Sequence, residues 1–204
     1  MEMDWKTNMA ELGGAFMVSL LVLGEMGDDG SMVMAGLLLA VTMAAMAGAH
    51  VLPMFTWISA MTGDLQDTDA WINNGMRLVF QLVGACVAMV LMAEAGEMSA
   101  ADEMSTWSFD LWGEADNNMD GAAMMLVGGA LIGAIASRCD GWMTAFAVVA
   151  LAGSLGAGVD GASMMAGELL GDGGDIVGGL SHWILDGVVI GLGAMLGGML
   201  EEQL

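Results

Sequence analysis

Long apolar runs alternate with short acidic stretches along the whole chain. Six of the runs are about 20 residues long, the length that a helix needs to cross the roughly 30 Å hydrocarbon core of a bilayer. Each of these runs carries few charges. The pattern therefore predicts an all-α integral membrane protein with six transmembrane helices. The predicted spans are residues 9–26, 32–49, 72–93, 121–137, 141–158 and 180–200.

Two shorter apolar pieces remain, at residues 53–61 and 165–171. Each is too short to cross a bilayer, and each follows a predicted span with almost no polar turn before it. A segment of this kind is tolerated at membrane depth only where it is buried in protein or lines a water-filled cavity. We therefore expect two re-entrant half-helices.

The two halves of the chain repeat each other. GAHVLPMF at 48–55 and GASMMAGE at 161–168 each follow the second span of their half, and Glu11 near the first span has a counterpart in Asp120 near the fourth. Three spans per half invert the second half, so the half-helices meet near the midplane, where such folds bind their substrates. The expected division of this single channel domain is 1–97 first repeat, 98–119 acidic extracellular loop and 120–204 second repeat.

Composition and charge agree with a membrane protein that has acidic rims. The chain is 57% hydrophobic, yet 25 acidic residues against 3 basic ones give a net charge of −22. This acidic excess argues against nucleic acid and anionic lipid headgroups as partners. With six spans, Lys6, Arg77 and Arg138 fall on one face, which the positive-inside rule makes cytoplasmic. We expect an integral protein of the plasma membrane with both termini in the cytoplasm.

Catalytic and metal-binding motifs are missing from the sequence. We find no nucleophile–base pair, phosphate loop or metal-ligand spacing, so we expect no enzyme, no cofactor and no metal site. The 24 methionines lie mostly in the predicted spans, where methionine is an adaptable filler. A soft-metal role remains an alternative for Met54, Met164 and Met165, because thioethers suit Cu(I).

Five motifs in order resemble the major intrinsic protein family, the aquaporins and glycerol facilitators. The motifs are MAELGGAF at 9–16, AGAHVLPMFT at 47–56, QLVGA at 81–85, GASMMAGELLG at 161–171 and HWILDGVVIGLGA at 182–194. The resemblance covers nearly the whole chain. It implies the aquaporin-like fold of six spans, two half-helices and an inverted repeat, a homotetramer in the lipid bilayer, and a separate passive pore in each subunit.

The resemblance also marks the pore centre, where the family carries Asn-Pro-Ala twice. Here the two copies read Leu52-Pro53-Met54 and Met165-Ala166-Gly167, so both asparagines are replaced by side chains that cannot donate hydrogen bonds. The half-helix N-termini should still point inward with a partial positive charge. The implied centre is electropositive in its backbone and apolar in its side chains.

At the positions of the family's selectivity filter, this sequence departs further from the family pattern. Its arginine falls on Glu168, its span-five position on Gly153, its loop position on Ala162, and its span-two position on Met32 or Ala35. These residues imply a wide, acidic mouth, and acids at a pore mouth favour cations. Alternatively, Glu168 only caps the first turn of its half-helix, where the dipole favours a carboxylate.

The other polar residues either brace the half-helix loops or have two alternative roles. The resemblance implies that Glu11 and Asp120 brace the half-helix loops, and that His50 keeps a bracing loop position. Asp186 lies outside the family pattern and could line the pore or pair with a neighbouring helix.

Three functions therefore compete. The first is a passive channel for small neutral polar solutes, with water as a further permeant. The second is a cation-permeable pore built on Glu168. The third, suggested by the loss of both asparagines and the arginine, is a non-conducting structural membrane protein.

Overall fold

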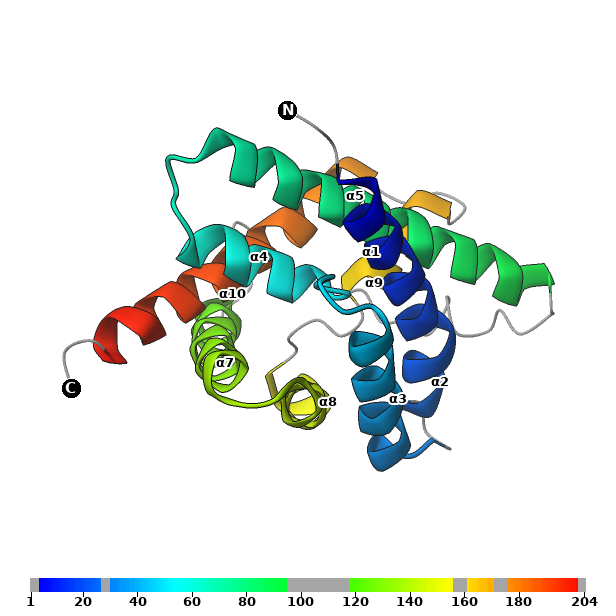
Figure 1. Ribbon diagram of the computed structural model, residues 1–204, viewed down its shortest axis with the longest axis horizontal. Coiled ribbons are helices and arrows are strands. Elements are labelled where there is room, and N and C mark those ends of the chain that lie inside the picture. Colours follow the sequence, from blue (N-terminus) through cyan, green and yellow to red (C-terminus); the bar gives the residue numbers. More distant parts are fainter. Residues whose placement is uncertain (1–3, 27–29, 95–117, 156–160, 171–175, 202–204) are drawn as a thin grey trace.

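The computed structural model describes residues 4–26, 30–94, 118–155, 161–170 and 176–201, which are almost entirely helical (Figure 1). The first helical stretch combines α1 (Trp5–Met17), the π-helical turn η1 (Val18–Val22) and α2 (Leu23–Met26). The other helices are α3 (Met32–Ala45), α4 (Pro53–Thr62), α5 (Thr68–Glu94), α7 (Asn118–Arg138), α8 (Gly141–Leu155), α9 (Gly161–Leu170) and α10 (Ile176–Glu201). The protein is all-helical in these residues.

Three helical stretches are long and apolar enough to cross a membrane: Trp5–Met26, Thr68–Met92 and Ile176–Leu200. The other three predicted spans correspond to shorter apolar helices, Met32–Ala45, Ala122–Arg138 and Gly141–Leu151. The protein is therefore an all-α membrane protein with at least three candidate spans.

Several helix boundaries differ from the expected ones. The second apolar run ends as a helix at Ala45, four residues early, because Met46 leaves the helical region and Gly48 has a φ of +93°. Helix α7 begins at Asn118, inside the expected 98–119 loop, and the rest of that loop from 98 to 117 lies outside the described residues.

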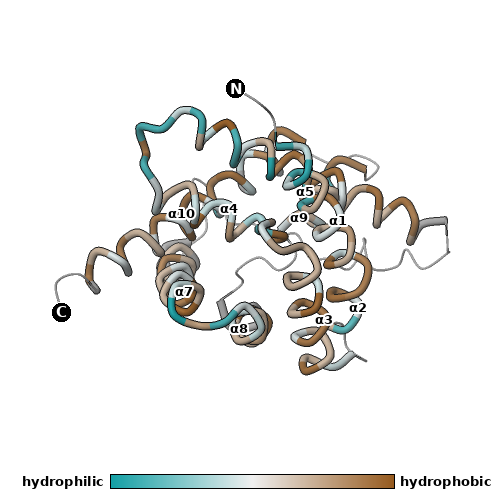
Figure 2. Tube along the Cα trace, in the orientation of Figure 1, coloured by the Kyte–Doolittle hydropathy of each residue, from teal (hydrophilic) through white to brown (hydrophobic). Residues whose placement is uncertain are grey.

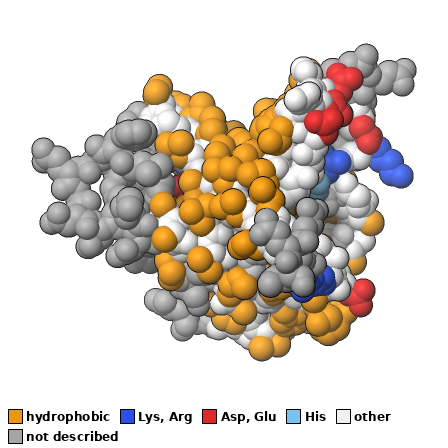
Figure 3. Space-filling model, turned by 90° about the vertical axis from the view of Figure 1, so that its left-hand side faces the viewer, with side chains coloured by type: hydrophobic (Ala, Val, Ile, Leu, Met, Phe, Trp, Pro, Cys, Tyr) orange, Lys and Arg blue, Asp and Glu red, His pale blue; other side chains and the backbone are white. Residues whose placement is uncertain are grey.

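Apolar side chains cover much of the outer surface. Val33 is 70% exposed, Val127 54% and Val177 79%, although all three lie on apolar helices. The described part of the face in Figure 3 is largely hydrophobic, and the hydrophilic residues in Figure 2 gather in connections such as the one between α4 and α5. Contiguous exposed apolar surface of this kind marks contact with a membrane or a partner. Combined with the long apolar helices, this surface is consistent with a membrane protein.

The two short helices α4 and α9 lie in the middle of the molecule (Figure 1) and contact each other. Helix α5 packs on both, and so does α10. Around them, α1 packs on α5, α7 packs on α10, and α3 packs on α8. One apolar core joins the first helical stretch, α3, α4, α7, α8 and α10, and its buried members include Val22, Leu39, Leu52, Met125, Val148 and Ile190. A second, smaller cluster joins α5 and α9 through Ala85, Ala162 and Ala166.

Glycines allow the closest helix crossings. A Cβ on Gly84 of α5 would collide with the carbonyl oxygen of Leu12 on α1, and a Cβ on Gly193 of α10 would collide with the carbonyl oxygen of Leu126 on α7. Backbones can approach this closely only where the side chain is a hydrogen atom, as is common between membrane helices. These two glycines therefore set the distance between the paired helices.

We predict that Gly84→Ala lowers the stability of the protein by about 1–3 kcal/mol, because the added methyl group overpacks the crossing with α1. Gly75→Ala on the same helix is the matched control, since a Cβ there meets nothing within 4 Å. The control should be neutral or slightly stabilising, because alanine favours helices. Thermal unfolding in detergent would measure both, and equal midpoints for the two variants would contradict the close crossing.

Candidate functional site at the meeting of α4 and α9

The loop between α3 and α4 has an unusual backbone. Gly48 and Val51 both adopt positive φ, +93° and +68° respectively. For a β-branched residue such as Val51 this left-handed conformation is a genuine outlier that costs on the order of 1–3 kcal/mol. It persists only where the surroundings over-determine it. The surroundings here come from α1.

The carboxylate of Glu11 on α1 holds this loop. Its Oε1 accepts the backbone N–H of His50 at 2.6 Å, and its Oε2 accepts the backbone N–H of Val51 at 2.8 Å. The side chain of Glu11 is completely buried. Two charge-assisted hydrogen bonds to consecutive amides thus offset the strain at Val51.

Gly14 completes the seat for Val51. A Cβ on Gly14 would lie 2.8 Å from a methyl carbon of Val51, so only glycine leaves room for that side chain. Glu11 and Gly14 are one helical turn apart and therefore share a face of α1. The spacing of a glutamate and a glycine three residues later therefore has a physical reason. Glu11 binds the loop backbone, and Gly14 leaves room for the side chain of Val51.

Helix α5 supplies the rest of the carboxylate's partners. Arg77 Nη1 donates to Glu11 Oε1 at 3.0 Å, and Gln81 Nε2 donates to Glu11 Oε2 at 2.7 Å. Arg77 also reaches the carbonyl oxygen of Gly48 at 3.4 Å. Each oxygen of Glu11 therefore accepts two hydrogen bonds. A buried charge is tolerated only when it is paired and hydrogen-bonded in this way.

Sequence reasoning missed Arg77 and Thr56 as members of this cluster, and it used Gln81 only as part of a motif. The available signal was the spacing of Arg77 and Gln81, which places two polar groups one turn apart on the same face of α5. Thr56 gave no such signal, because a threonine on a short apolar helix is common and only its contacts distinguish it.

Thr56 on α4 links Gln81 to the ring of His50. Both hydrogens of Gln81 Nε2 are used, one toward Glu11 and one toward Thr56 Oγ1 at 3.0 Å. The same hydroxyl is hydrogen-bonded to His50 Nδ1, which lies 3.1 Å away. The chain of bonds joins α1, α5, α4 and the loop.

The pKa of His50 is lowered from 6.5 to about 4. Burial, which disfavours the charged ring, is the larger cause, and the neighbouring positive charge of Arg77 adds to it. His50 is consequently neutral at physiological pH and remains hydrogen-bonded to Thr56.

Helix α4 begins at Pro53 directly after this loop. Leu52 is extended and gives no side-chain cap, while proline in the first turn suits a position whose N–H has no helical partner. The start of α9 lies beside it, since a Cβ on Gly161 would be 3.9 Å from Pro53 Cγ and 3.5 Å from Trp183 Nε1. The first turns of the two short helices therefore meet inside the protein.

The expected start of the second half-helix is wrong. Helix α9 begins at Gly161, four residues before the expected 165, so Met165, Ala166 and Gly167 lie in its middle. The position that holds Pro53 in the first copy is Ala166 in the second, and alanine and methionine favour a continuous helix. Nothing in the local sequence interrupts the helix before residue 165.

This earlier start also corrects the first-turn position of Glu168. The residue lies in the last turn of α9, where the helix dipole is negative and a carboxylate is not a cap. The side chain is half-buried and packs on α10, since a Cβ on Gly179 would lie 2.9 Å from Glu168 Cγ. The capping alternative is therefore wrong.

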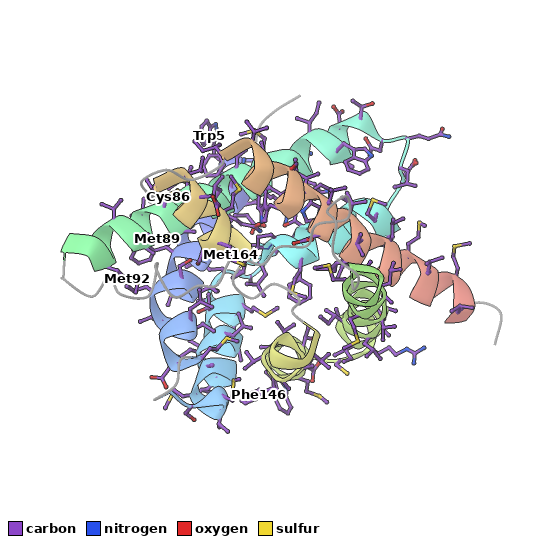
Figure 4. All side chains as sticks on the ribbon, turned by 180° about the vertical axis from the view of Figure 1, so that it is seen from behind. Trp5, Cys86, Met89, Met92, Phe146 and Met164 are labelled. Carbon is purple, nitrogen blue, oxygen red and sulfur yellow. The ribbon has the colours of Figure 1, made fainter. Side chains whose placement is uncertain are left out.

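The residues expected at the pore centre are packed against apolar neighbours. Leu52 is 1% exposed, Met54 and Met165 are each 2% exposed, and Ala166 is fully buried. On the α5 side, Ala162 and Ala166 pack with Ala85, while Met89 lies over Gly167. Figure 4 shows Cys86 and Met89 of α5 on the same side of the molecule as Met164 of α9. Solvent therefore reaches almost nothing of Leu52, Met54, Met165 and Ala166.

The other residues expected at the pore mouth or in loop bracing either lie apart from one another or have side chains outside the described part of the structure. Met32, the first residue of α3, is 51% exposed, whereas its alternative Ala35 is buried in the apolar core. The side-chain surroundings of Gly153 and Asp120 lie outside the described residues. Among the side chains that are described, no group of three or more His, Cys, Asp or Glu is close enough to hold a metal ion.

We predict that acid destabilises the protein through His50. The pKa of His50 in the folded protein is about 4 against 6.5 for the free side chain, so the unfolded chain binds the proton more readily between these values. This contribution to stability is complete above pH 6.5 and is lost as the pH falls toward 4. Thermal midpoints of the wild type and His50→Asn should therefore converge or cross on acidification. A pH-independent difference between the two proteins would contradict the buried neutral ring.

We also predict strong coupling between Glu11 and Arg77. Arg77→Met should cost about 2 kcal/mol, because it removes a charge-assisted bond from a buried carboxylate. Glu11→Gln should cost a similar amount, because the NH2 group of glutamine would replace one acceptor oxygen and would point at N–H donors. The double variant should lose less than the sum by about 1 kcal/mol or more. Additive losses in thermal or denaturant unfolding would show that the two residues act independently.

The comparison with known proteins gives no match. No family model matches the sequence, and no curated protein matches it either. The inference of function therefore depends on the motifs, the packing of the helices and the geometry around α4 and α9.

Proposed function

We propose that this protein is a transmembrane channel of the aquaporin and glycerol-facilitator type that conducts small neutral polar solutes and water passively. The observation that carries the proposal is the meeting of two short helices by their first turns inside the protein, with Pro53 of α4 beside Gly161 of α9. Broken helices that meet near the midplane form the substrate site in inverted-repeat transporters and channels. Neither short helix has the length to cross a bilayer alone.

The packing of the helices supports an inverted repeat of six spans and two half-helices. Exchanging the first span with α7, α3 with α8, α4 with α9 and α5 with α10 turns each main packing pair into another. The pair α1–α5 becomes α7–α10, α5–α9 becomes α10–α4, and α4–α5 becomes α9–α10, while α3–α8 and α4–α9 are preserved. Two halves with one fold account for this correspondence.

The glycine crossings give the register of the proposed repeat. Gly84 lies against the carbonyl of Leu12 as Gly193 lies against the carbonyl of Leu126. In this register, the residue before Leu12 is Glu11 and the residue before Leu126 is Met125, so Glu11 corresponds to Met125 and not to Asp120. Three residues before Gly84 and Gly193 lie Gln81 and Ile190, which correspond to each other. Met125 and Ile190 are both buried and apolar, so the second half has no equivalent of the carboxylate cluster at these positions.

An apolar centre selects by size and polarity. The side chains of Leu52 and Met165 donate no hydrogen bonds, while the first turns of α4 and α9 still present partial positive charge. Hydrophobic constrictions of this kind gate by losing their water. The described conformation, with Leu52 and Met165 only 1–2% exposed, is the closed state of such a gate. We propose a homotetramer in the plasma membrane, with both termini in the cytoplasm and one path in each subunit.

A second candidate is a structural membrane protein that conducts nothing. The observation in its favour is the same apolar packing of Leu52, Met54 and Met165, which leaves no surface for a solute to contact. This candidate keeps the fold and the loop cluster, and it assigns them to stability alone.

We predict that purified protein in liposomes accelerates osmotic swelling in stopped-flow measurements with small neutral solutes. A Leu52→Asn/Met165→Asn double variant should swell several-fold faster, because two amide donors would stabilise polar solutes and water at the centre. Val87→Ile on the exposed face of α5 is the control that leaves the centre unchanged.

Three results would change the proposal. No swelling with either the wild type or the asparagine variant would favour the structural candidate. A bilayer current that disappears in Glu168→Gln would favour a cation pore. Swelling unchanged by the asparagine substitutions would mean that the path does not run between α4 and α9.

A further inference from the structure

A second polar contact lies at the centre, away from the Glu11 cluster. The hydroxyl oxygens of Ser19 and Ser163 are 2.6 Å apart and form a hydrogen bond. Ser19 is 5% exposed and Ser163 is 2% exposed, and apolar residues flank both along the chain. One hydroxyl belongs to the first span and the other to α9, so this bond crosses between the two halves of the chain.

The π-helical turn brings Ser19 to this position. Residues Val18–Val22 form the turn, and the N–H of Leu23 bonds to the carbonyl of Val18, five residues earlier. Such a turn inserts one residue into a helix and rotates the following side chains relative to a regular α-helix. A π-turn in an apolar helix costs regular hydrogen bonding, and these turns occur frequently at functional sites. Here the residue inside the turn that contacts α9 is Ser19.

The two short helices are thus held by different chemistry. The loop before α4 is tied by the buried carboxylate of Glu11, whereas Met125 occupies the matching position of the second half. On its α5 side, α9 packs through apolar side chains: Ala162 and Ala166 lie against Ala85, with Leu82, Cys86 and Met89 around them. Apolar contacts of this kind are non-directional and leave rotation about the helix axis weakly determined.

We propose that the Ser19–Ser163 hydrogen bond is the positioning contact of α9, and that the π-turn exists to deliver it. The bond sets the rotation of α9 about its axis. That rotation decides whether the side chain of Met164 or that of Met165 faces α4. It takes the place in the second half that the carboxylate of Glu11 has in the first. Its effect on conduction depends on the proposed channel function, but the contact itself does not.

Disulfide crosslinking tests the contact without any measurement of flux. The background carries Cys86→Ala and Cys139→Ala, and Ser19→Cys with Ser163→Cys should form an intramolecular disulfide on mild oxidation in liposomes. Ser19→Cys combined with Ser137→Cys, an exposed residue of α7, is the control and should not crosslink. Absence of the Ser19–Ser163 crosslink, or equal crosslinking in the control, would overturn the proposal.

A double-substitution cycle then separates positioning from simple packing. Ser19→Ala, Ser163→Ala and the double variant should all lower the thermal midpoint by a similar amount, about 2–4 °C, because each removes the same bond. Ser163→Thr keeps the hydroxyl and should restore most of the loss. Additive losses, or no rescue by threonine, would overturn the proposal.

Flux decides the functional part. If the wild type conducts, Ser163→Ala should change the ratio of permeabilities for small and larger neutral solutes several-fold, and Ser163→Thr should restore it; an unchanged ratio would overturn a role in the path. If the wild type conducts nothing, the proposed channel function fails, and the crosslink and the cycle alone decide whether this bond positions α9.

Discussion

The carboxylate of Glu11, buried in the first span, is the interaction on which the interior depends. A fully buried charge is costly and persists only with a full set of partners. Its four donors come from the loop before α4 and from α5, so satisfying one charge brings three segments of the chain together. The strained conformation of Val51 follows from this tie, and with it the point at which α4 begins.

Around that tie, the helices are held by small residues rather than by interlocking large ones. Gly84 and Gly193 let two helix pairs approach until backbone meets backbone. In a bilayer the lipid is as apolar as the side chains, so close packing and internal hydrogen bonds must provide much of the association. The outward valines of α3, α7 and α10 form an exposed apolar surface of the kind that contacts a membrane or a partner.

The interior is therefore asymmetric in its chemistry although its helix packing is paired. The loop before α4 is held by an ion pair together with an amide, a hydroxyl and a ring, whereas α9 is joined to the π-turn of the first helical stretch by a pair of hydroxyls. Leu52 and Met165, which carry no side-chain donors, are buried as well. A centre of this composition depends on the two polar contacts for its geometry, because apolar side chains alone would allow several arrangements.

The hydrophobic pattern by itself determined the class of the protein, the existence of nearly every helix and the two short central ones, because apolar runs and proline act locally. The motifs singled out Glu11 and His50, and in the structure the carboxylate of Glu11 accepts the backbone N–H of His50. Only the tertiary structure decided the partners Arg77 and Thr56 and the contact of Ser19 with Ser163, since these pairs are far apart in the chain. It also decided the start of α9, which moved Glu168 from the first turn to the last. Helix starts without a proline or a strong cap depend on packing against neighbours, and that information is not local in the sequence.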